Sequence, residues 1–380
     1  MTREAVIVDC ARTAFGKRKG ALAGWHPTDL LGLVLRTMIE RNDFDPARID
    51  DVVGGCVTQS GEQGCNVTRN AWIAGGLPWH VPATSVDRQC GSSQQAVHFV
   101  AQGVLAGAYD IAIACGVESM TRAPMSSNAR GGVGPFSGEF LANTNNTLGI
   151  QFWVAQVLAD KWGITREEMD AYALQSHQRA AANEEFFRGE IIPVGGLTSD
   201  EGVRADASLE KIASLSPAWE SEEQPAPNIT AANSSQMTDG AAAMIIASAD
   251  FAEANGLPVR ARFKHFAVAA EDPVLVLSAP VPVTYKLMER SGMKTDDFDA
   301  VECNEAFAAI ALMWQKEFDY PMDRFNPRGG AIALGHPLGA SGVALMTRLL
   351  RHLEATGGTY GFQTMCEGGG QANATVIERL

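Results

Sequence analysis

The chain has 380 residues, 46% hydrophobic and 19% charged, which suits two or three compact α/β units and excludes a disordered or coiled-coil protein. Its 44 acidic and 30 basic residues give a net charge of −14, which disfavours nucleic acid and anionic membranes as partners. The seven cysteines lack metal-ligand spacing, so we predict neither a disulfide framework nor a metal site. Without a signal-peptide pattern or a membrane-spanning apolar run, we expect a cytoplasmic protein that is not inserted in membranes.

The first third of the chain alternates strand and helix patterns. Strands are predicted at 6–10, 51–57, 82–86 and 109–116, and helices at 28–40, 66–74 and 91–105. Such alternation predicts a largely parallel sheet covered by helices. Arg12, Lys17, Arg18 and Lys19 form a basic cluster in this part, which is either a solvated loop or an anion-binding site.

The composition changes between residues 118 and 237. Pro, Ser, Asn and Gly crowd 124–146, two polar-faced helices are predicted at 152–162 and 166–188, and 220–227 reads as an acidic surface loop. We interpret 118–237 as an inserted loop domain.

The alternation then resumes in the last third of the chain. Strands are predicted at 240–248, 261–270, 299–302 and 360–366, and helices at 283–291, 305–318 and 339–354. A glycine-opened helix followed by a cysteine-bearing strand occurs in both parts, which indicates a duplication, although chance similarity is the alternative. The expected halves are 1–117 plus 238–257, and 258–380.

Cys90 stands at the turn between the predicted strand 82–86 and the helix that follows. The free N–H groups and positive dipole end of that helix would favour a thiolate, which is the reactive form of cysteine. The alternative is a small buried cysteine packed behind a glycine turn.

Three more segments carry candidate chemistry. His336 lies in a rigid Gly/Pro loop, Cys366 ends a strand before a glycine run, and Asn304 stands where a strand passes into a helix. Each has an ordinary alternative: a capping or core histidine, a buried strand thiol, and an N-cap followed by Glu305 in the first helical turn.

With these segments together, the sequence resembles the thiolase family over nearly its whole length. The matching stretches are Asp9-Cys10-Ala11-Arg12-Thr13, the Cys90 turn, Gly116-Val117-Glu118-Ser119-Met120-Thr121-Arg122-Ala123-Pro124, Asn304-Glu305-Ala306-Phe307, Gly335-His336-Pro337 and Cys366-Glu367-Gly368-Gly369-Gly370. The resemblance implies two similar βαβαβαββ halves in a layered α-β-α-β-α core, and an acyltransferase that cleaves 3-ketoacyl-CoA with coenzyme A to acetyl-CoA or propionyl-CoA, or runs the Claisen reverse.

The resemblance also assigns roles to the motif residues. Cys90 would be the acylated nucleophile, His336 its base, and Cys366 the general acid and base for the carbanion. His336 with a water held by Asn304 would form one oxyanion hole, and the N–H groups of Cys90 and Gly368 the other. No metal or redox cofactor is required.

For coenzyme A, the resemblance carries over Arg204, Ser235, Ala306 and Phe307 as binding residues. The ordinary alternatives are a solvated loop arginine for Arg204 and a turn residue for Ser235. The expected partners are acyl-CoA and coenzyme A, and the expected assembly is a homodimer or homotetramer.

The chain departs from the family pattern just before the first insertion helix. Many thiolases have a His-Met-Gly run where this chain has Ile150-Gln151-Phe152, followed by Trp153. The aromatic bulk argues against a simple acetoacetyl-CoA substrate, although both rings could merely pack the insertion.

The sequences of these motifs most resemble those of bacterial degradative thiolases, including the thiolases of fatty-acid and steroid-ring catabolism. The alternatives are a biosynthetic acetoacetyl-CoA thiolase, a ketoacyl synthase, which would need a His or Asn in place of Cys366, and a catalytically idle acyl-CoA-binding relative.

Overall fold

A computed structural model describes residues 3–380 of the chain. Its strands follow one path in the order β4-β3-β5-β7-β1-β8-β11-β10-β9. These strands are β1 (Ala5–Thr13), β3 (Val52–Gly55), β4 (Ala83–Val86), β5 (Ile111–Ser119), β7 (Thr238–Ser248), β8 (Ala261–Ala270), β9 (Ala300–Cys303), β10 (Tyr360–Glu367) and β11 (Gln371–Arg379). Two short strands pair off this path, β2 (Gly16–Lys17) with β7 and β6 (Ile191–Ile192) with β1.

The path consists of two halves with the same pairing pattern. In β3-β5-β7-β1 the successive pairs are parallel, antiparallel and antiparallel, and the same sequence of pairings recurs in β9-β10-β11-β8. The halves join where β1 meets β8, with Val6 opposite Arg262 and Ile7 opposite Ala261. The predicted duplication is therefore confirmed.

The expectation of a largely parallel sheet is wrong for the middle of this path. Along the path, parallel pairing is confined to β4-β3-β5 and to β9-β10, whereas β7, β1, β8 and β11 pair antiparallel with one another; off the path, the short β6 pairs parallel with β1. The physical reason is clearest at β11, which the sequence analysis missed. It follows β10 after the short turn at 368–370, and two strands joined by so short a turn can only pair antiparallel.

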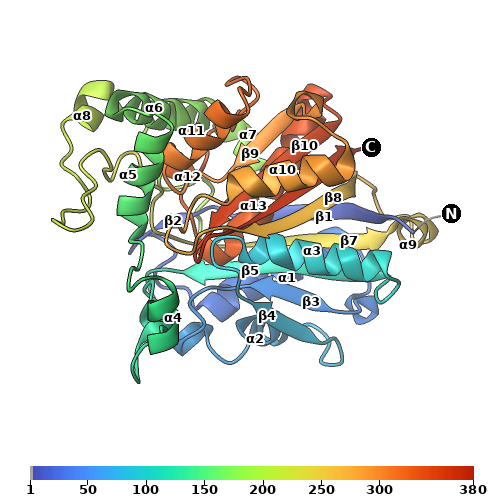
Figure 1. Cartoon of the computed structure of the whole chain (residues 1–380). Helices are drawn as coiled ribbons and strands as arrows, with labels where there is room; N and C mark the ends of the chain where they lie inside the picture. The colour runs from blue at the N-terminus through green and yellow to red at the C-terminus, as the bar shows by residue number, and fades with distance from the viewer. Residues whose placement is uncertain (1–2) are drawn as a thin grey trace.

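The helices form three layers around the strands (Figure 1). In the centre, α3 (Ser92–Leu105) and α13 (Leu338–Thr356) pack on each other, and α13 contacts strands of both halves. On one outer face lie α1 (Pro27–Arg41) and α2 (Val67–Ala74), and on the other α10 (Pro280–Ser291) beside α11 (Ala308–Glu317). This is the layered α-β-α-β-α arrangement that the resemblance implied.

Glycines let the two central helices approach closely where they begin. A Cβ atom on Gly342 would lie 2.2 Å from the backbone nitrogen of Gln94, and one on Gly116 would lie 2.0 Å from the carbonyl oxygen of Gly339. No side chain fits in these gaps. The start of α3, which follows Cys90, therefore lies next to the start of α13, which follows His336.

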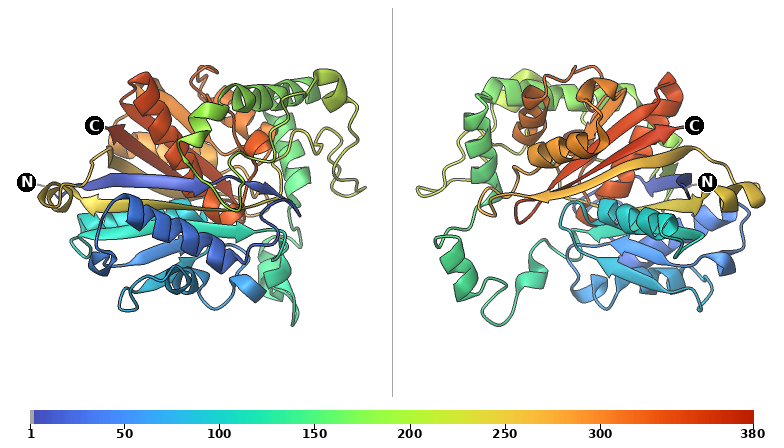
Figure 2. Two further views of the ribbon diagram at one scale, coloured as in Figure 1. Left: turned by 180° about the vertical axis from the view of Figure 1, so that it is seen from behind. Right: turned by 45° about the vertical axis from the view of Figure 1, so that its right-hand side comes forward.

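The region between β5 and β7 extends from one end of the sheet (Figures 1 and 2). It holds α4 (Gly138–Asn143), α5 (Gln151–Lys161), α6 (Arg166–Ala182), α7 (Glu184–Arg188) and α8 (Leu209–Ala213). The single helix predicted at 166–188 is interrupted at Asn183, whose side-chain amide donates to the carbonyl of Arg179 at 2.7 Å. An asparagine side chain that bonds to the preceding turn in this way competes with helix continuation.

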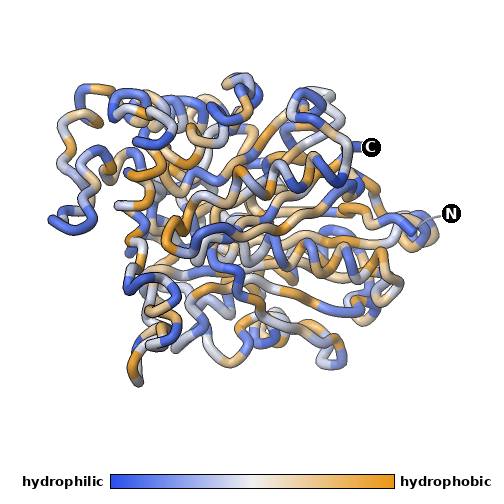
Figure 3. The backbone as a smooth tube through the Cα atoms, viewed as in Figure 1, coloured by the Kyte–Doolittle hydropathy of each residue, from blue (hydrophilic) through white to orange (hydrophobic). Residues whose placement is uncertain are grey.

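The apolar core follows the central strands. Every residue of β5 and of β7 is buried, as expected for strands with helices on both faces. Figure 3 shows these segments as mostly apolar, whereas the loop after α8 is hydrophilic. Across residues 3–380, no helix combines the length and apolar character needed to cross a bilayer.

Arg12 is buried and so is not part of an exposed basic cluster with Lys17, Arg18 and Lys19. Its guanidinium pairs with Glu190 at 2.6 Å and with Asp200 at 2.6 Å, and all three side chains are nearly inaccessible. Arg12 therefore joins β1 to the inserted region and does not serve an external anion.

Candidate active site

Cys90 lies in the turn between β4 and α3, as predicted. Gln89 before it adopts a left-handed φ of 48°, and Gly91 after it caps the helix. A Cβ atom on Gly91 would lie 1.9 Å from Oε1 of Glu367, so only glycine fits there. The Cys90 turn is therefore pressed against the end of β10, the strand that carries Cys366.

The surroundings of Cys90 do not favour a resting thiolate. Burial and, to a smaller extent, the nearby carboxyl group of Glu367 raise the pKa of this thiol to about 12. This differs from the expectation drawn from the helix terminus, because desolvation outweighs the dipole of α3. Cys90 therefore rests as a neutral thiol and requires a base.

His336 is suited to be that base. Its Nδ1 lies 2.6 Å from Oγ of Ser341, and the Ser341 hydroxyl donates to the carbonyl of Pro337 at 2.8 Å. Since the single hydroxyl proton is already committed, Ser341 accepts from Nδ1–H, which leaves the lone pair on Nε2. Burial lowers the pKa of His336 to about 4, so the ring is neutral near pH 7.

Asn304 faces the other nitrogen of the imidazole. Its Nδ2 donates to Nε2 of His336 at 3.3 Å, and its backbone N–H donates to Thr364 at 3.1 Å. The N-cap interpretation is wrong, because α11 begins only at Ala308 with Phe307 as its cap. Asn304 and Glu305 instead lie in the loop between β9 and α11, where their side chains turn into the protein.

Cys366 and Gly368 lie at the end of β10. The Cys366 thiol is buried, and burial raises its pKa well above the ordinary value, with further contributions from the neighbouring Cys90 and Cys303. A Cβ atom on Gly368 would lie 2.9 Å from Oε1 of Gln89. The structure thus brings Cys366 and Gly368 to the Cys90 turn, as the motif predictions require.

Two buried carboxylates that the sequence analysis did not single out hold these loops. Glu118 accepts backbone N–H groups from Val57, Thr58 and Gly339, each within 3.0 Å. Gly339 lies in the first turn of α13, where a negative charge also interacts favourably with the positive end of the helix dipole. The loop after β3 is thereby tied to the helix that follows His336.

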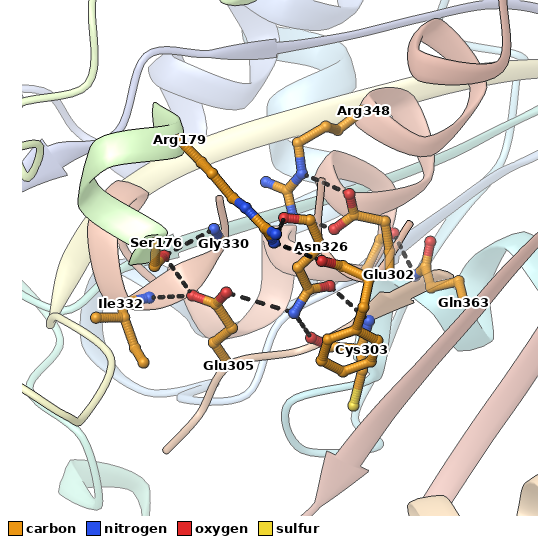
Figure 4. Close-up of polar contacts among 12 residues, drawn as sticks. Ser176, Arg179, Glu302, Cys303, Glu305, Asn326, Gly330, Ile332, Arg348 and Gln363 are labelled. Atoms are coloured by element: carbon orange, nitrogen blue, oxygen red, sulfur yellow. Dashed lines mark hydrogen bonds and ion pairs between the residues drawn. The ribbon is translucent and has the colours of Figure 1, made fainter. Parts of the chain in front are cut away.

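Glu305 is the second buried carboxylate (Figure 4). Its oxygens accept the hydroxyls of Tyr172 at 2.9 Å and Ser176 at 2.8 Å, and the backbone N–H of Ile332 at 3.1 Å. Burial raises the pKa of Glu305, and the bonds from Ser176, Ile332 and Tyr172 oppose that shift. The sequence signals for this network are the Asn304-Glu305-Ala306-Phe307 motif and the polar pair Tyr172 and Ser176, four residues apart on a helix.

A groove of about 430 Å³ opens between α6 and α8. This α6–α8 groove is lined by His177, Arg204, Asp206, Ala207, Lys211, Ile212, Leu215, Ala231, Ala232, Gln236 and Ile332. Its wall thus combines Arg204, the ion pair of Lys211 with Asp206 at 2.9 Å and an apolar surface, a composition suited to a phosphorylated nucleotide with an organic arm.

The four residues predicted to bind coenzyme A have different positions. Arg204 lines the α6–α8 groove and is exposed. Ser235 is outside the lining, and its backbone N–H donates to the carbonyl of Ala306 at 2.9 Å. Ala306 and Phe307 are buried, so they can offer a ligand little more than the edge of their surface.

His177 lines the same groove and was not predicted as a site residue. The backbone N–H of Arg204 donates to its Nδ1 at 3.2 Å, so the ring proton is on Nε2. Burial and the charge of Arg204 lower the pKa of His177 to about 4, which keeps the ring neutral. A neutral N–H donor is thereby presented by the groove wall.

The aromatic residues at the departure from the family pattern are partly buried. The ring of Phe152 stacks on Trp219 at 6.1 Å and meets Phe307 edge-on at 5.6 Å. Trp153 packs against the same core. Phe152 therefore packs within the inserted region and also touches the loop that carries Asn304.

Within the described residues, no group of three or more His, Cys, Asp or Glu side chains is arranged to hold a metal ion.

Comparison with known proteins gives two family matches. The sequence model of the thiolase N-terminal domain matches residues 5–250, and that of the thiolase C-terminal domain matches residues 257–379.

Individual proteins are similar over the full length. A protein named steroid 3-ketoacyl-CoA thiolase FadA6 from Mycobacterium tuberculosis is 46% identical over 393 residues, covering 99% of this chain and 94% of that protein. Proteins named 3-ketoacyl-CoA thiolase from Aliivibrio fischeri and Vibrio cholerae are each 40% identical, covering 99% and 98% of this chain and 100% and 99% of their own lengths.

Proposed function

The chain belongs to the thiolase family of acyltransferases, and we propose that it cleaves 3-ketoacyl-CoA with coenzyme A into acetyl-CoA or propionyl-CoA and a shortened acyl-CoA. One observation carries this proposal: Cys90 in the turn after β4 and Cys366 at the end of β10 lie close enough for Cys90 to raise the pKa of the Cys366 thiol. A thiol nucleophile and a thiol acid at one centre suit a reaction that breaks a carbon–carbon bond next to a thioester.

In the first half-reaction, Nε2 of His336 takes the proton of the Cys90 thiol, and the sulfur attacks the ketone carbon. The bond between C2 and C3 breaks, its electron pair forms the enolate of acetyl-CoA, and Cys366 protonates C2. The products are acetyl-CoA, a Cys90 thioester, a Cys366 thiolate and a protonated His336.

In the second half-reaction, coenzyme A gives its thiol proton to the Cys366 thiolate and attacks the Cys90 thioester. Cys90 leaves and recovers its proton from His336. The enzyme returns to its starting state, and all protons are accounted for.

Each half-reaction develops charge on a carbonyl oxygen. The oxygen of the carbonyl that Cys90 attacks is best reached by the N–H of Cys90 itself and by that of Gly368, since a nucleophile's own N–H lies beside its adduct. The enolate oxygen is then left to His336 and Asn304, the latter acting through a water molecule.

Coenzyme A is proposed to bind in the α6–α8 groove. The exposed Arg204 and Lys211 there suit phosphate groups, and the apolar wall formed by Ile212 and Leu215 suits the adenine ring. Ser235, Ala306 and Phe307 would border the pantetheine arm on its way from the groove to Cys90.

The acyl chain is proposed to be longer than acetoacetyl or to bear rings. The support is the aromatic group of Phe152, Trp219 and Phe307 beside the Asn304 loop, and the similarity to a protein named as a steroid thiolase. Degradation of fatty acids or steroids in the cytoplasm is the corresponding role.

The decisive experiment incubates the protein with short, long and ring-bearing 3-ketoacyl-CoA esters and follows acetyl-CoA and intact protein mass. We expect a Cys90 acyl adduct, its absence in Cys90→Ala, and retained adduct formation from simple acyl-CoA in Cys366→Ala with loss of carbon–carbon cleavage. Coenzyme A binding without adduct or cleavage for any ester would instead identify an idle binding relative. Acetoacetyl-CoA as the best ester would favour the biosynthetic alternative.

The domain division and the assembly are also proposed. Residues 118–237 would form the unit that covers the substrate, inserted between a half made of 1–117 plus 238–257 and a half made of 258–380. A homodimer or homotetramer is expected, and sedimentation at micromolar concentration distinguishes the two from a monomer.

A further inference from the structure

We propose that Glu305 is the positioning residue that holds Asn304 against His336, and that through Tyr172 and Ser176 it makes this placement depend on helix α6 of the inserted region. The inference rests on the proposed function, because its consequence concerns the enolate of that reaction. It adds a residue that does not touch substrate but determines where an oxyanion donor lies.

The first argument is that the residues before and after Asn304, Cys303 and Glu305, are both held by hydrogen bonds to other segments (Figure 4). Before it, Cys303 exchanges two bonds with Asn326, whose Oδ1 accepts the Cys303 N–H at 2.9 Å and whose Nδ2 donates to the Cys303 carbonyl at 2.8 Å. After it, the buried carboxylate of Glu305 accepts hydrogen bonds from Tyr172, Ser176 and Ile332. The backbone N–H of Asn304 bonds to Thr364, but its side chain has only the long 3.3 Å contact with His336 and an Oδ1 without a partner among the described residues. Its side chain is therefore placed mainly by its neighbours.

The second argument is the number of segments that meet at the carboxylate. Tyr172 and Ser176 come from α6, and Ile332 comes from α12 (Ala331–Leu334), which leads to His336. The Ser176 hydroxyl also accepts the N–H of Gly330 at 3.1 Å. A Cβ atom on Gly330 would lie 2.4 Å from the carboxyl carbon of Glu305, so glycine is needed for this approach. The carboxyl group of Glu305 thus joins the loop that carries Asn304 to α6 and to α12.

The third argument is the position of α6 between the two sites. Ser176 turns inward to Glu305, while the next residue, His177, lines the α6–α8 groove. The same helix turn therefore contacts the proposed coenzyme A site on one side and the anchor of Asn304 on the other. A shift of α6 is transmitted to Asn304 through two hydroxyl groups and one carboxylate.

Loss of the Glu305 anchor should affect carbon–carbon cleavage and acyl exchange differently. Asn304 is assigned to the enolate oxygen, which exists only while the carbon–carbon bond breaks or forms. Transfer of an acyl group between Cys90 and coenzyme A needs the other pair of donors, on Cys90 and Gly368. Loss of the Glu305 anchor should therefore slow cleavage far more than acyl exchange.

The test is Glu305→Gln, which keeps the shape but places an amide N–H₂ group among groups that all donate. Acetyl-CoA release from 3-ketoacyl-CoA in a single turnover measures cleavage, and exchange of labelled coenzyme A into acyl-CoA measures acyl transfer. We expect cleavage to fall about 10- to 100-fold, less than the loss of an oxyanion donor itself, and exchange to change by less than about threefold. Tyr172→Phe and Ser176→Ala, which each remove one donor, should lower the same ratio by smaller factors.

Glu302→Gln is the matched control, because Glu302 is equally buried but pairs with Arg348 at 2.5 Å and does not touch Glu305. It should reduce stability without changing the ratio of the two rates. Equal loss of both rates in Glu305→Gln, or no loss of either, would overturn the inference. If the wild-type protein catalyses neither reaction, the proposed function fails and not the positioning role alone.

Discussion

The hydroxyl of Ser341 lies 2.6 Å from Nδ1 of His336 and donates its own proton to Pro337. Ser341 therefore selects the imidazole tautomer whose Nε2 can accept a proton. Ser341→Ala should lower kcat/KM about fivefold, in line with the loss of one hydrogen bond of roughly 1 kcal/mol.

The rate at which iodoacetamide alkylates Cys90 depends on deprotonation of the thiol by His336. This rate should therefore fall by a similar factor. Thr347→Val is the control, since it removes a hydroxyl-to-backbone bond from the same buried helix without touching His336. An unchanged alkylation rate in Ser341→Ala would show that another group sets the tautomer.

Glu367 should make the protein less stable as the pH rises. Both of its oxygens are buried without a hydrogen-bond partner among residues 3–380, and burial raises its pKa to about 9. The unfolded chain releases this proton near pH 4, so between pH 4 and 9 the folded state binds more protons and loses stability with increasing pH.

Glu367→Gln cannot titrate and should be free of this loss. Its melting temperature relative to wild type should rise between pH 5 and pH 9, as measured by calorimetry. Glu222→Gln, at an exposed position, should show no such change. A constant difference across this range would mean that Glu367 is ionised in the native protein.

His177 should contribute to coenzyme A affinity through its Nε2–H. His177→Asn keeps an acceptor for the Arg204 N–H but removes the groove donor, whereas His177→Gln can keep that donor. We expect KM for coenzyme A to rise about 5- to 10-fold in the Asn variant, the value of one hydrogen bond, with kcat nearly unchanged. The Gln variant should stay closer to wild type. Indistinguishable Asn and Gln variants would place the donor outside the ligand site.

Phe152 should select the acyl group. Phe152→Ala removes an aromatic wall, so kcat/KM for ring-bearing or long-chain esters should fall about 10-fold while that for acetoacetyl-CoA changes little. Phe140→Ala, a more exposed phenylalanine of the same inserted region, is the control. An equal decrease for all esters would show that Phe152 only packs the insertion.

Much of the architecture follows local rules. The 3.6-residue and two-residue periodicities place α1, α3 and β5 within a few residues of their observed bounds, because these patterns reflect which side of a segment is buried. The strand β11 is not predicted by these periodicities, and α6 and α7 are predicted as one helix at 166–188. In both places a single turn residue or glycine run, rather than periodicity, decides the outcome.

The sequence by itself determined which residue types could do chemistry, because Cys90 and His336 stand in loops framed by glycine or proline and Cys366 ends a strand just before a glycine run. Tertiary structure alone decided their states. The neutral thiol of Cys90 depends on its burial, the tautomer of His336 on Ser341, and the anchoring of Asn304 on Glu305. Burial and long-range contacts set those states, and neither is encoded in the spacing of residues along the chain.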